Sequence, residues 1–169
     1  MSRPWPEALK LGDTGERLAE EILLPQLFPD ARISRLKTEN QRWLHADFLV
    51  VSRRKYLVEV KYDTYDTGNL ALETKLVYPS GQVVPGWLYR TKADFVLYIL
   101  AAFKEAYLLP TDELRLFAHQ HEFPVKSTMV HGTKAYFFLV PRDQLPFRGI
   151  EYGSERQESK ADSGTLQQL

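Results

Sequence analysis

The stretch DFLVVSRRKYLVEVK, residues 47–61, decides the fold. Two runs rich in Val, Leu, Phe and Tyr, residues 46–51 and 56–62, lie on either side of a short polar and basic segment. Such a pair of runs is typical of a β-hairpin. The acids and the lysine in the stretch stand at the edges of these apolar runs, where unpaired charges are costly if the strands are buried.

Side chains alternate along a strand, so Glu59 and Lys61 share one face. A three-residue loop, Ser52–Arg54, places Asp47 opposite Glu59 on that same face, whereas a two- or four-residue loop sends Asp47 to the other face. In the odd-loop register both faces are apolar in the middle, which is the pattern of strands covered on both sides in an α/β sheet. The reverse face then carries Phe48, Val50, Val58 and Val60.

Two carboxylates that face each other repel, and a cation between them is one remedy. A hard ion such as Mg²⁺ accepts carboxylate oxygens, backbone carbonyls and waters, and needs only one or two carboxylates. The main-chain carbonyl of Val60 is a further candidate ligand. The alternative is a strand-end salt bridge, in which Glu59 or Asp47 pairs with Lys61 or Arg54.

Around the hairpin, the pattern predicts helices and strands in the order of an α/β domain. The helices are expected at 12–28, ended or kinked by Pro25, and at 111–119. The strands are expected at 31–37, 69–76, 93–103, 106–109 and 135–140, with a loop at 79–86.

Asp47, eleven residues and then Glu59-Val60-Lys61, after a helix containing GERLAE, resemble the PD-(D/E)XK nuclease superfamily, the restriction-endonuclease-like fold. The resemblance implies an α-β-β-β-α-β core with a mixed central sheet flanked by helices. It implies that Asp47 and Glu59 bind Mg²⁺, with Mn²⁺ as a substitute, that Lys61 orients the attacking water, and that Glu16 or Glu20 completes the site. Ala46 departs from the pattern, since it stands where the family name has Pro.

The later segments TGNLALETK and GWLYRTKADF are similar to nuclease-like proteins of phage and prophage origin. This likeness implies that Glu73 adds a further acid and that Asn69 shapes the loop. The motif E-x-K by itself is weak, because Glu73-Thr74-Lys75 and Glu158-Ser159-Lys160 also match it. Neither of these has an aspartate at hairpin spacing.

Several other residues admit a structural and a functional interpretation. Trp5, Trp43 and Trp87 are predicted to pack, with base stacking as the alternative for tryptophans in loops. His45 is expected to point away from Asp47 if both lie in the strand. Asp94 repeats the A-D-F setting of Asp47, but no E-x-K follows it, so a structural role is predicted.

Length and composition bound the remaining expectations. A chain of 169 residues predicts one domain, residues 1–152, and the polar segment 153–169 predicts a disordered tail. The absence of cysteine excludes disulfides, thiolate metal sites and a cysteine nucleophile. No apolar run is long enough to span a bilayer, so no membrane association and a cytoplasmic location are expected.

The resulting hypothesis is a metal-dependent DNA endonuclease that acts by direct attack of water. DNA is the expected partner, with Arg53, Arg54 and Lys55 contacting phosphates if the hairpin edges a groove, and a homodimer is expected from how such nucleases cut two strands. Two alternatives remain: a catalytically inactive nuclease-fold DNA-binding or phage accessory protein, and a metal-dependent hydrolase of another phosphoester. The net charge of zero supplies no global attraction to nucleic acid, which favours these alternatives or a structure-selective enzyme over a promiscuous nuclease.

Overall fold

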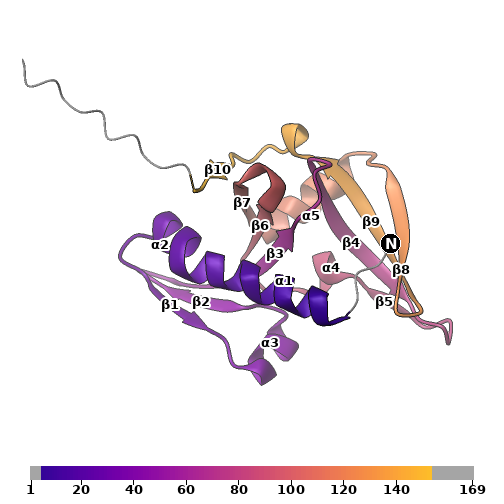
Figure 1. Cartoon of the computed structure of the whole chain (residues 1–169), viewed down its shortest axis with the longest axis horizontal. Coiled ribbons are helices and arrows are strands. Elements are labelled where there is room, and N and C mark those ends of the chain that lie inside the picture. Colours follow the sequence, from indigo (N-terminus) through magenta and orange to yellow (C-terminus); the bar gives the residue numbers. More distant parts are fainter. Residues whose placement is uncertain (1–4, 154–169) are drawn as a thin grey trace, which may run out of the picture.

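The computed structural model describes residues 5–153, which build two sheets and the helices that cover them (Figure 1). The larger sheet has six strands in the order β1-β2-β3-β6-β7-β10, and the smaller sheet has four in the order β5-β4-β9-β8. Pairing is mixed in the larger sheet and antiparallel throughout the smaller one. The predicted α/β class with a mixed central sheet is confirmed.

The strands and helices have the following bounds, given in chain order. The strands are β1 Arg32–Arg35, β2 Phe48–Val51, β3 Lys55–Asp63, β4 Asn69–Val77, β5 Val83–Pro85, β6 Phe95–Leu100, β7 Glu105–Pro110, β8 Val125–Val130, β9 Thr133–Pro141 and β10 Ile150–Glu151. The helices are α1 Trp5–Leu18, η1 Ala19–Leu23, α2 Leu24–Leu27, α3 Thr38–Leu44, α4 Trp87–Arg90, η2 Ala101–Phe103, α5 Thr111–Gln120 and η3 Arg142–Gln144.

The larger sheet follows the predicted order of elements. After α1, the strands β1, β2 and β3 form an antiparallel meander, and the chain returns through α4 to β6, which pairs in parallel with β3. With α3 and the strands of the smaller sheet set aside, this is the α-β-β-β-α-β order. A parallel pair needs a long crossover connection, and the segment between β3 and β6 supplies it.

The hairpin of β2 and β3 has the predicted register. Val51 pairs with Lys55 across the loop Ser52–Arg54, and Phe48 pairs with Val58 at the other end of the ladder. Asp47, one residue before Phe48, therefore comes opposite Glu59. The three-residue loop thus brings the two acids to one end of the hairpin.

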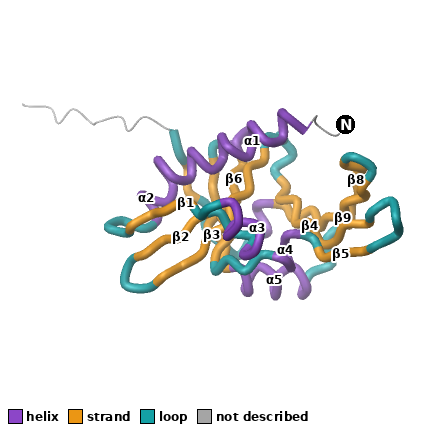
Figure 2. Tube along the Cα trace, turned by 90° about the horizontal axis from the view of Figure 1, so that it is seen from below, coloured by secondary structure: helices purple, strands orange, loops and turns teal. Residues whose placement is uncertain are grey.

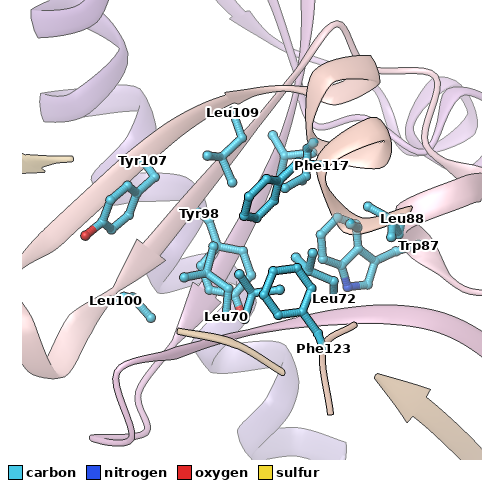
Figure 3. Close-up of a cluster of buried hydrophobic side chains, with 14 residues drawn as sticks. Leu70, Leu72, Trp87, Leu88, Tyr98, Leu100, Tyr107, Leu109, Phe117 and Phe123 are labelled. Carbon is cyan, nitrogen blue, oxygen red and sulfur yellow. The ribbon is translucent and has the colours of Figure 1, made fainter. Parts of the chain in front are cut away.

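One core lies between the two sheets (Figure 3). Leu70 and Leu72 of β4 pack against Tyr98 of β6, and the short helix α4 inserts Trp87 and Leu88 into the same cluster. All five are buried. Burial of this kind is worth about 1.5–3 kcal/mol for each large side chain, so α4 is held firmly against β4.

A second core covers the opposite face of the larger sheet. Phe48, Val50, Val58 and Val60 meet the buried residues of η1 and α2 there. The helical segment runs along one side of the sheet (Figure 2). The side chains predicted for the reverse face of the hairpin are therefore confirmed. The other face is only partly covered, because Leu49, Val51 and Leu57 are half-buried.

Other expectations were wrong in detail. The first helix begins at Trp5 rather than at residue 12. The helical backbone runs past Pro25, which lies in the first turn of α2 directly after the π-helical segment η1, so the chain changes helix type before the proline rather than ending there. The strand expected at 69–76 forms as β4, but in the smaller sheet. Part of the loop expected at 79–86 forms β5. The missed strand β8 is exposed along its whole length and so lacks the alternating pattern of a half-buried strand.

No helix within residues 5–153 is long and apolar enough to cross a membrane. The tail predicted from residue 153 onward lies, apart from Gly153, outside the described residues.

Candidate active site at the open edge of β3

The site lies where β3 continues beyond its partner. β2 pairs only with residues 55–58 of β3, whereas β6 pairs with residues 58–63 on the other side. The edge of β3 beyond Val58 therefore has no strand on the β2 side. A cavity of about 400 Å³ opens at this edge, lined by Leu11, Gly12, Glu16, Asp47, Glu59, Val60, Lys61 and Tyr62.

Asp47 takes the place of a strand partner at this edge. The backbone N–H of Asp47 donates to the carbonyl of Val58 at 2.9 Å, and its carboxylate oxygen Oδ2 accepts the N–H of Val60 at 2.7 Å. In an antiparallel ladder the N–H and C=O of one residue point to the same side. The carbonyl of Val60 therefore faces the same edge as the Asp47 carboxylate.

The pKa of Asp47 reports a crowded site. Burial and then the charge of Glu59 raise this pKa, the Val60 N–H and Lys61 oppose the rise, and the result is a pKa of about 7. A carboxylic acid whose pKa lies this far above its ordinary value is poorly solvated and faces another acid. Such groups gather at functional sites.

Glu59 and Lys61 lie together on β3. Glu59 is buried, with 8% of its surface exposed, and its oxygen Oε1 is paired with the ammonium of Lys61. The same ammonium lies 5.2 Å from the centre of the Trp87 ring. The predicted salt bridge of Glu59 with Lys61 is thus present, and it occurs inside the cavity.

The charge of Lys61 is fixed by its neighbours. Burial lowers the pKa of Lys61, but the Glu59 carboxylate, with smaller contributions from Asp47 and Glu73, outweighs that effect and leaves the pKa above its ordinary value. Lys61 is therefore a cation at neutral pH. It is suited to donate hydrogen bonds and is unsuited to accept a proton.

The two acids of the first helix are placed differently. Glu16 lines the cavity, and Glu20 does not. Burial is the main cause that raises the pKa of Glu16, Arg35 opposes it, and the charges of Asp13 and Glu59 add to the rise. Glu20 turns to Arg35, whose Nη2 lies 2.9 Å from its Oε2, and the other guanidinium nitrogen, Nη1, lies 3.3 Å from Glu16.

A glycine allows the first helix to approach the edge of β3. A Cβ at Gly15 would lie 2.4 Å from the Cβ of Tyr62, closer than such atoms approach in proteins. A Cβ at Gly12, one turn earlier, would meet nothing within 4 Å. Gly15 therefore sets the distance at which α1 brings Glu16 to the cavity.

The two residues implied by the phage likeness lie outside the cavity. Glu73 accepts the N–H of Trp87 at 3.0 Å and lies 3.5 Å from Arg90, while Gly86 passes so close that a Cβ would lie 2.3 Å from the Glu73 carbonyl oxygen. Asn69 lies at the start of β4, and its backbone N–H donates a hydrogen bond to Thr67 Oγ1 at 3.3 Å. Glu73 thus anchors α4.

The basic residues Arg53, Arg54 and Lys55 are exposed at the opposite end of the hairpin from the acids. Lys55 and Glu59 are four positions apart on β3, a distance of about 13 Å along a strand. The two arginines line a separate shallow cavity with Pro29 and Asp30. The structure does not bring these cations to the site.

The second A-D-F segment has the structural contact predicted for it. Asp94 Oδ2 accepts the N–H of Leu57 at 2.7 Å, as Asp47 Oδ2 accepts the N–H of Val60. Both aspartates therefore bond to the backbone of β3, yet only Asp47 lines the cavity with other acids. Asp94 provides a matched control for Asp47.

Three residues around α3 and α4 depart from the expectations or extend them. His45 is not in a strand: it follows α3 with φ of 46°. Trp87 packs as predicted, with 9% of its surface exposed, whereas Trp43 is 73% exposed and does not pack in a core. The side chain of Trp5 is not among those described. Trp87 carries no sequence signal that would have linked it to Lys61.

Within residues 5–153, no three His, Asp or Glu side chains gather closely enough to form a metal centre by themselves. The cavity instead offers two carboxylates, those of Asp47 and Glu59, with the carbonyl of Val60 at the same edge. This donor set contains only oxygen. It suits a hard cation that keeps several waters, as Mg²⁺ does.

No protein-family model matches the chain, and no curated protein matches it. Among solved structures, the chain is similar to a bacterial homing endonuclease, with 15% identity, a TM-score of 0.47, and coverage of 90% of this chain and 84% of that chain. Both the identity and the TM-score are low.

Proposed function

We propose that this protein is a metal-dependent DNA endonuclease of the PD-(D/E)XK type. The observation that carries the proposal is the convergence of Asp47, Glu59 and Lys61 on one cavity at the open edge of β3, with Glu16 reaching it from α1. The bond from the Val60 N–H to Asp47 closes the edge of β3, but that bond alone does not require Glu59 and Lys61 in the same cavity. Two acids beside one ammonium leave negative charge to be neutralised.

Asp47, Glu59 and the carbonyl of Val60 are the groups that would hold Mg²⁺ or Mn²⁺. Their fit is supported by the raised pKa of Asp47, which burial and the charge of Glu59 bring to about 7. When bound, a divalent cation would neutralise the carboxylates and stabilise negative charge on the phosphate. Glu16 would bond to a water of that ion or to the ion itself.

Lys61 supplies the positive donor of the reaction. Its ammonium is held by Glu59 and by the face of Trp87, and it remains protonated at neutral pH. It therefore orients the attacking water and donates to a phosphate oxygen, where negative charge grows in the transition state. The water oxygen bonds to phosphorus as the bond to the leaving sugar oxygen breaks, while the attacking water releases a proton to solvent and the leaving oxygen takes one up from solvent.

The proposal is tested by incubating the full chain with supercoiled, linear and branched DNA, with Mg²⁺, with Mn²⁺ or with a chelator. Nicking that requires the metal and is lost in Asp47→Asn and in Lys61→Ala is expected. Asp94→Asn and Lys75→Ala are the matched controls. Asp94 has the same A-D-F setting and the same kind of backbone bond, and Lys75 belongs to the other E-x-K on a strand.

Three results would contradict the proposal. Tight DNA binding without cleavage under every metal condition would indicate an accessory DNA-binding protein. Metal-dependent hydrolysis of small phosphoesters with intact DNA would indicate a different hydrolase. Nicking that persists in both site variants would indicate a contaminating nuclease.

A further inference from the structure

Trp43 is the most exposed of the large hydrophobic residues whose burial the structure describes, at 73%. Tryptophan offers a large apolar face, and proteins seldom leave it in water when it has no contact to make. It lies at the end of the short helix α3, in the segment that leads into Asp47. The residue that packing does not explain is therefore next to the site in the chain.

The end of α3 is fastened beside the site. The carbonyl of Leu44 accepts the N–H of Lys92 at 2.9 Å, and the carbonyl of His45 accepts the hydroxyl of Thr91 at 2.6 Å. Thr91 is buried and follows α4, whose Trp87 contacts Lys61. Four peptide units separate Trp43 from Asp47, so their Cα atoms lie within about 15 Å of each other.

A cation lies against Trp43. The ammonium of Lys92 lies 4.4 Å from the centre of the Trp43 ring. An aromatic face beside a cation is a combination that proteins use to hold single-stranded nucleic acid.

We infer that Trp43 and Lys92 hold an unpaired nucleotide next to the scissile phosphate, so that the enzyme prefers DNA with an unpaired base near the cut. The inference rests on the proposed nuclease function and names its substrate class. The base stacks on the face of the Trp43 ring that Lys92 leaves open, and Lys92 bonds to the adjoining phosphate.

An unpaired base is required because the faces of paired bases are already covered by their neighbours in the duplex. A flat indole can stack only on a base that is unpaired, terminal or flipped out. A net charge of zero also provides little attraction to an intact duplex. Stacking thus supplies affinity that charge does not.

The test uses full-length Asp47→Asn protein, which is expected to bind without cutting, and fluorescently labelled oligonucleotides. Binding is measured by anisotropy for a single strand, a flap, and a blunt duplex of the same sequence. Trp43→Ala is expected to weaken binding to the single strand and the flap roughly tenfold, while binding to the duplex changes little. Trp43→Phe is expected to restore most of the loss, because it keeps an aromatic face.

Two further variants sharpen the result. Tyr78→Ala removes another exposed aromatic residue, 38% exposed, and is expected to leave binding unchanged. Lys92→Gln is expected to weaken binding to every oligonucleotide and to reduce the salt dependence by about one phosphate contact. Equal weakening for single strand and duplex in Trp43→Ala would overturn the inference. The inference would also be overturned if Trp43→Ala left DNA binding unchanged but abolished self-association or the binding of a protein partner.

The two proposals fail separately. If wild-type protein cuts DNA with Mg²⁺ but Trp43→Ala cuts flaps and duplexes with the wild-type preference, the stacking inference fails and the nuclease stands. If no metal condition gives cleavage but the loss of single-strand binding in Trp43→Ala is found, the nuclease proposal fails and the stacking surface stands.

Discussion

The carboxylate of Asp47 accepts the backbone N–H of Val60 at 2.7 Å, and this bond completes the edge of β3 where β2 has ended. One side chain thereby does two things. It accepts a backbone hydrogen bond, and it lies close enough to Glu59 for the charge of Glu59 to raise its pKa. The stability of this arrangement depends on whether Asp47 carries a charge.

Asp47 is expected to make the metal-free protein less stable as the pH rises. Its pKa is about 7 in the folded protein and near 4 in an unfolded chain, so the folded state binds the proton more tightly. The resulting stabilisation is full below about pH 4 and is lost as the pH rises through 7. In Asp47→Asn this decline disappears. Between pH 4 and pH 8, the free energy of unfolding of the variant, measured in urea, should rise relative to that of wild type by on the order of 3 kcal/mol. A constant difference across this range would contradict the prediction.

Mg²⁺ is expected to raise the melting temperature of the wild-type protein at pH 8, where Asp47 is ionised. The gain reaches about 2.7 kcal/mol when the ion is a hundredfold above its dissociation constant. Asp47→Asn should lose the gain, and Asp94→Asn should keep it. Thermal melts with and without a chelator measure this directly, without any DNA. An equal response in all three proteins would place the ion elsewhere.

Glu16→Gln is expected to lower the rate of DNA cleavage roughly tenfold or more, as changes to groups around a metal commonly do. Glu20→Gln is the control on the same helix face, because Glu20 also pairs with Arg35 but does not line the cavity. Its cleavage rate should stay near wild type. The reverse order of the two rates would show that the cavity as described is not the site.

Gly15→Ala is expected to destabilise the protein by roughly 1–3 kcal/mol, because its Cβ would meet that of Tyr62 at 2.4 Å. Gly12→Ala, in the same helix with open space around it, should stabilise by up to about 1 kcal/mol from helix propensity alone. Chemical denaturation measures both. If Gly15→Ala were neutral, α1 would have to pack less closely on β3 than the structure shows.

The hairpin could be predicted from sequence because its own chemistry fixes it. The alternation of apolar residues and an odd loop give one register, and that register fixes which side chains share a face with Glu59. The choice between Glu16 and Glu20 could not be made, since residues four apart lie on one helix face. It depends on how closely Gly15 lets the helix approach Tyr62, which is a contact distant in sequence.

Other features could not be read from local pattern. β4 alternates as predicted, but nothing within Asn69–Val77 says which sheet it joins. Glu73 looked like a further acid of the site, and its carboxylate is instead engaged with the N–H of Trp87 and with Arg90. Trp43 is exposed because no segment within residues 5–153 covers it, and no property of the residue itself indicates this.

The mismatch in length between β2 and β3 has a consequence for how such a site can be gained or lost. If β2 were two residues longer, its backbone would pair with Val60 and would displace the carboxylate of Asp47 from that position. Every chemically active side chain could remain in the sequence while the pocket vanished. An insertion or deletion in β2 would thus inactivate the site while Asp47, Glu59 and Lys61 all remain in the sequence.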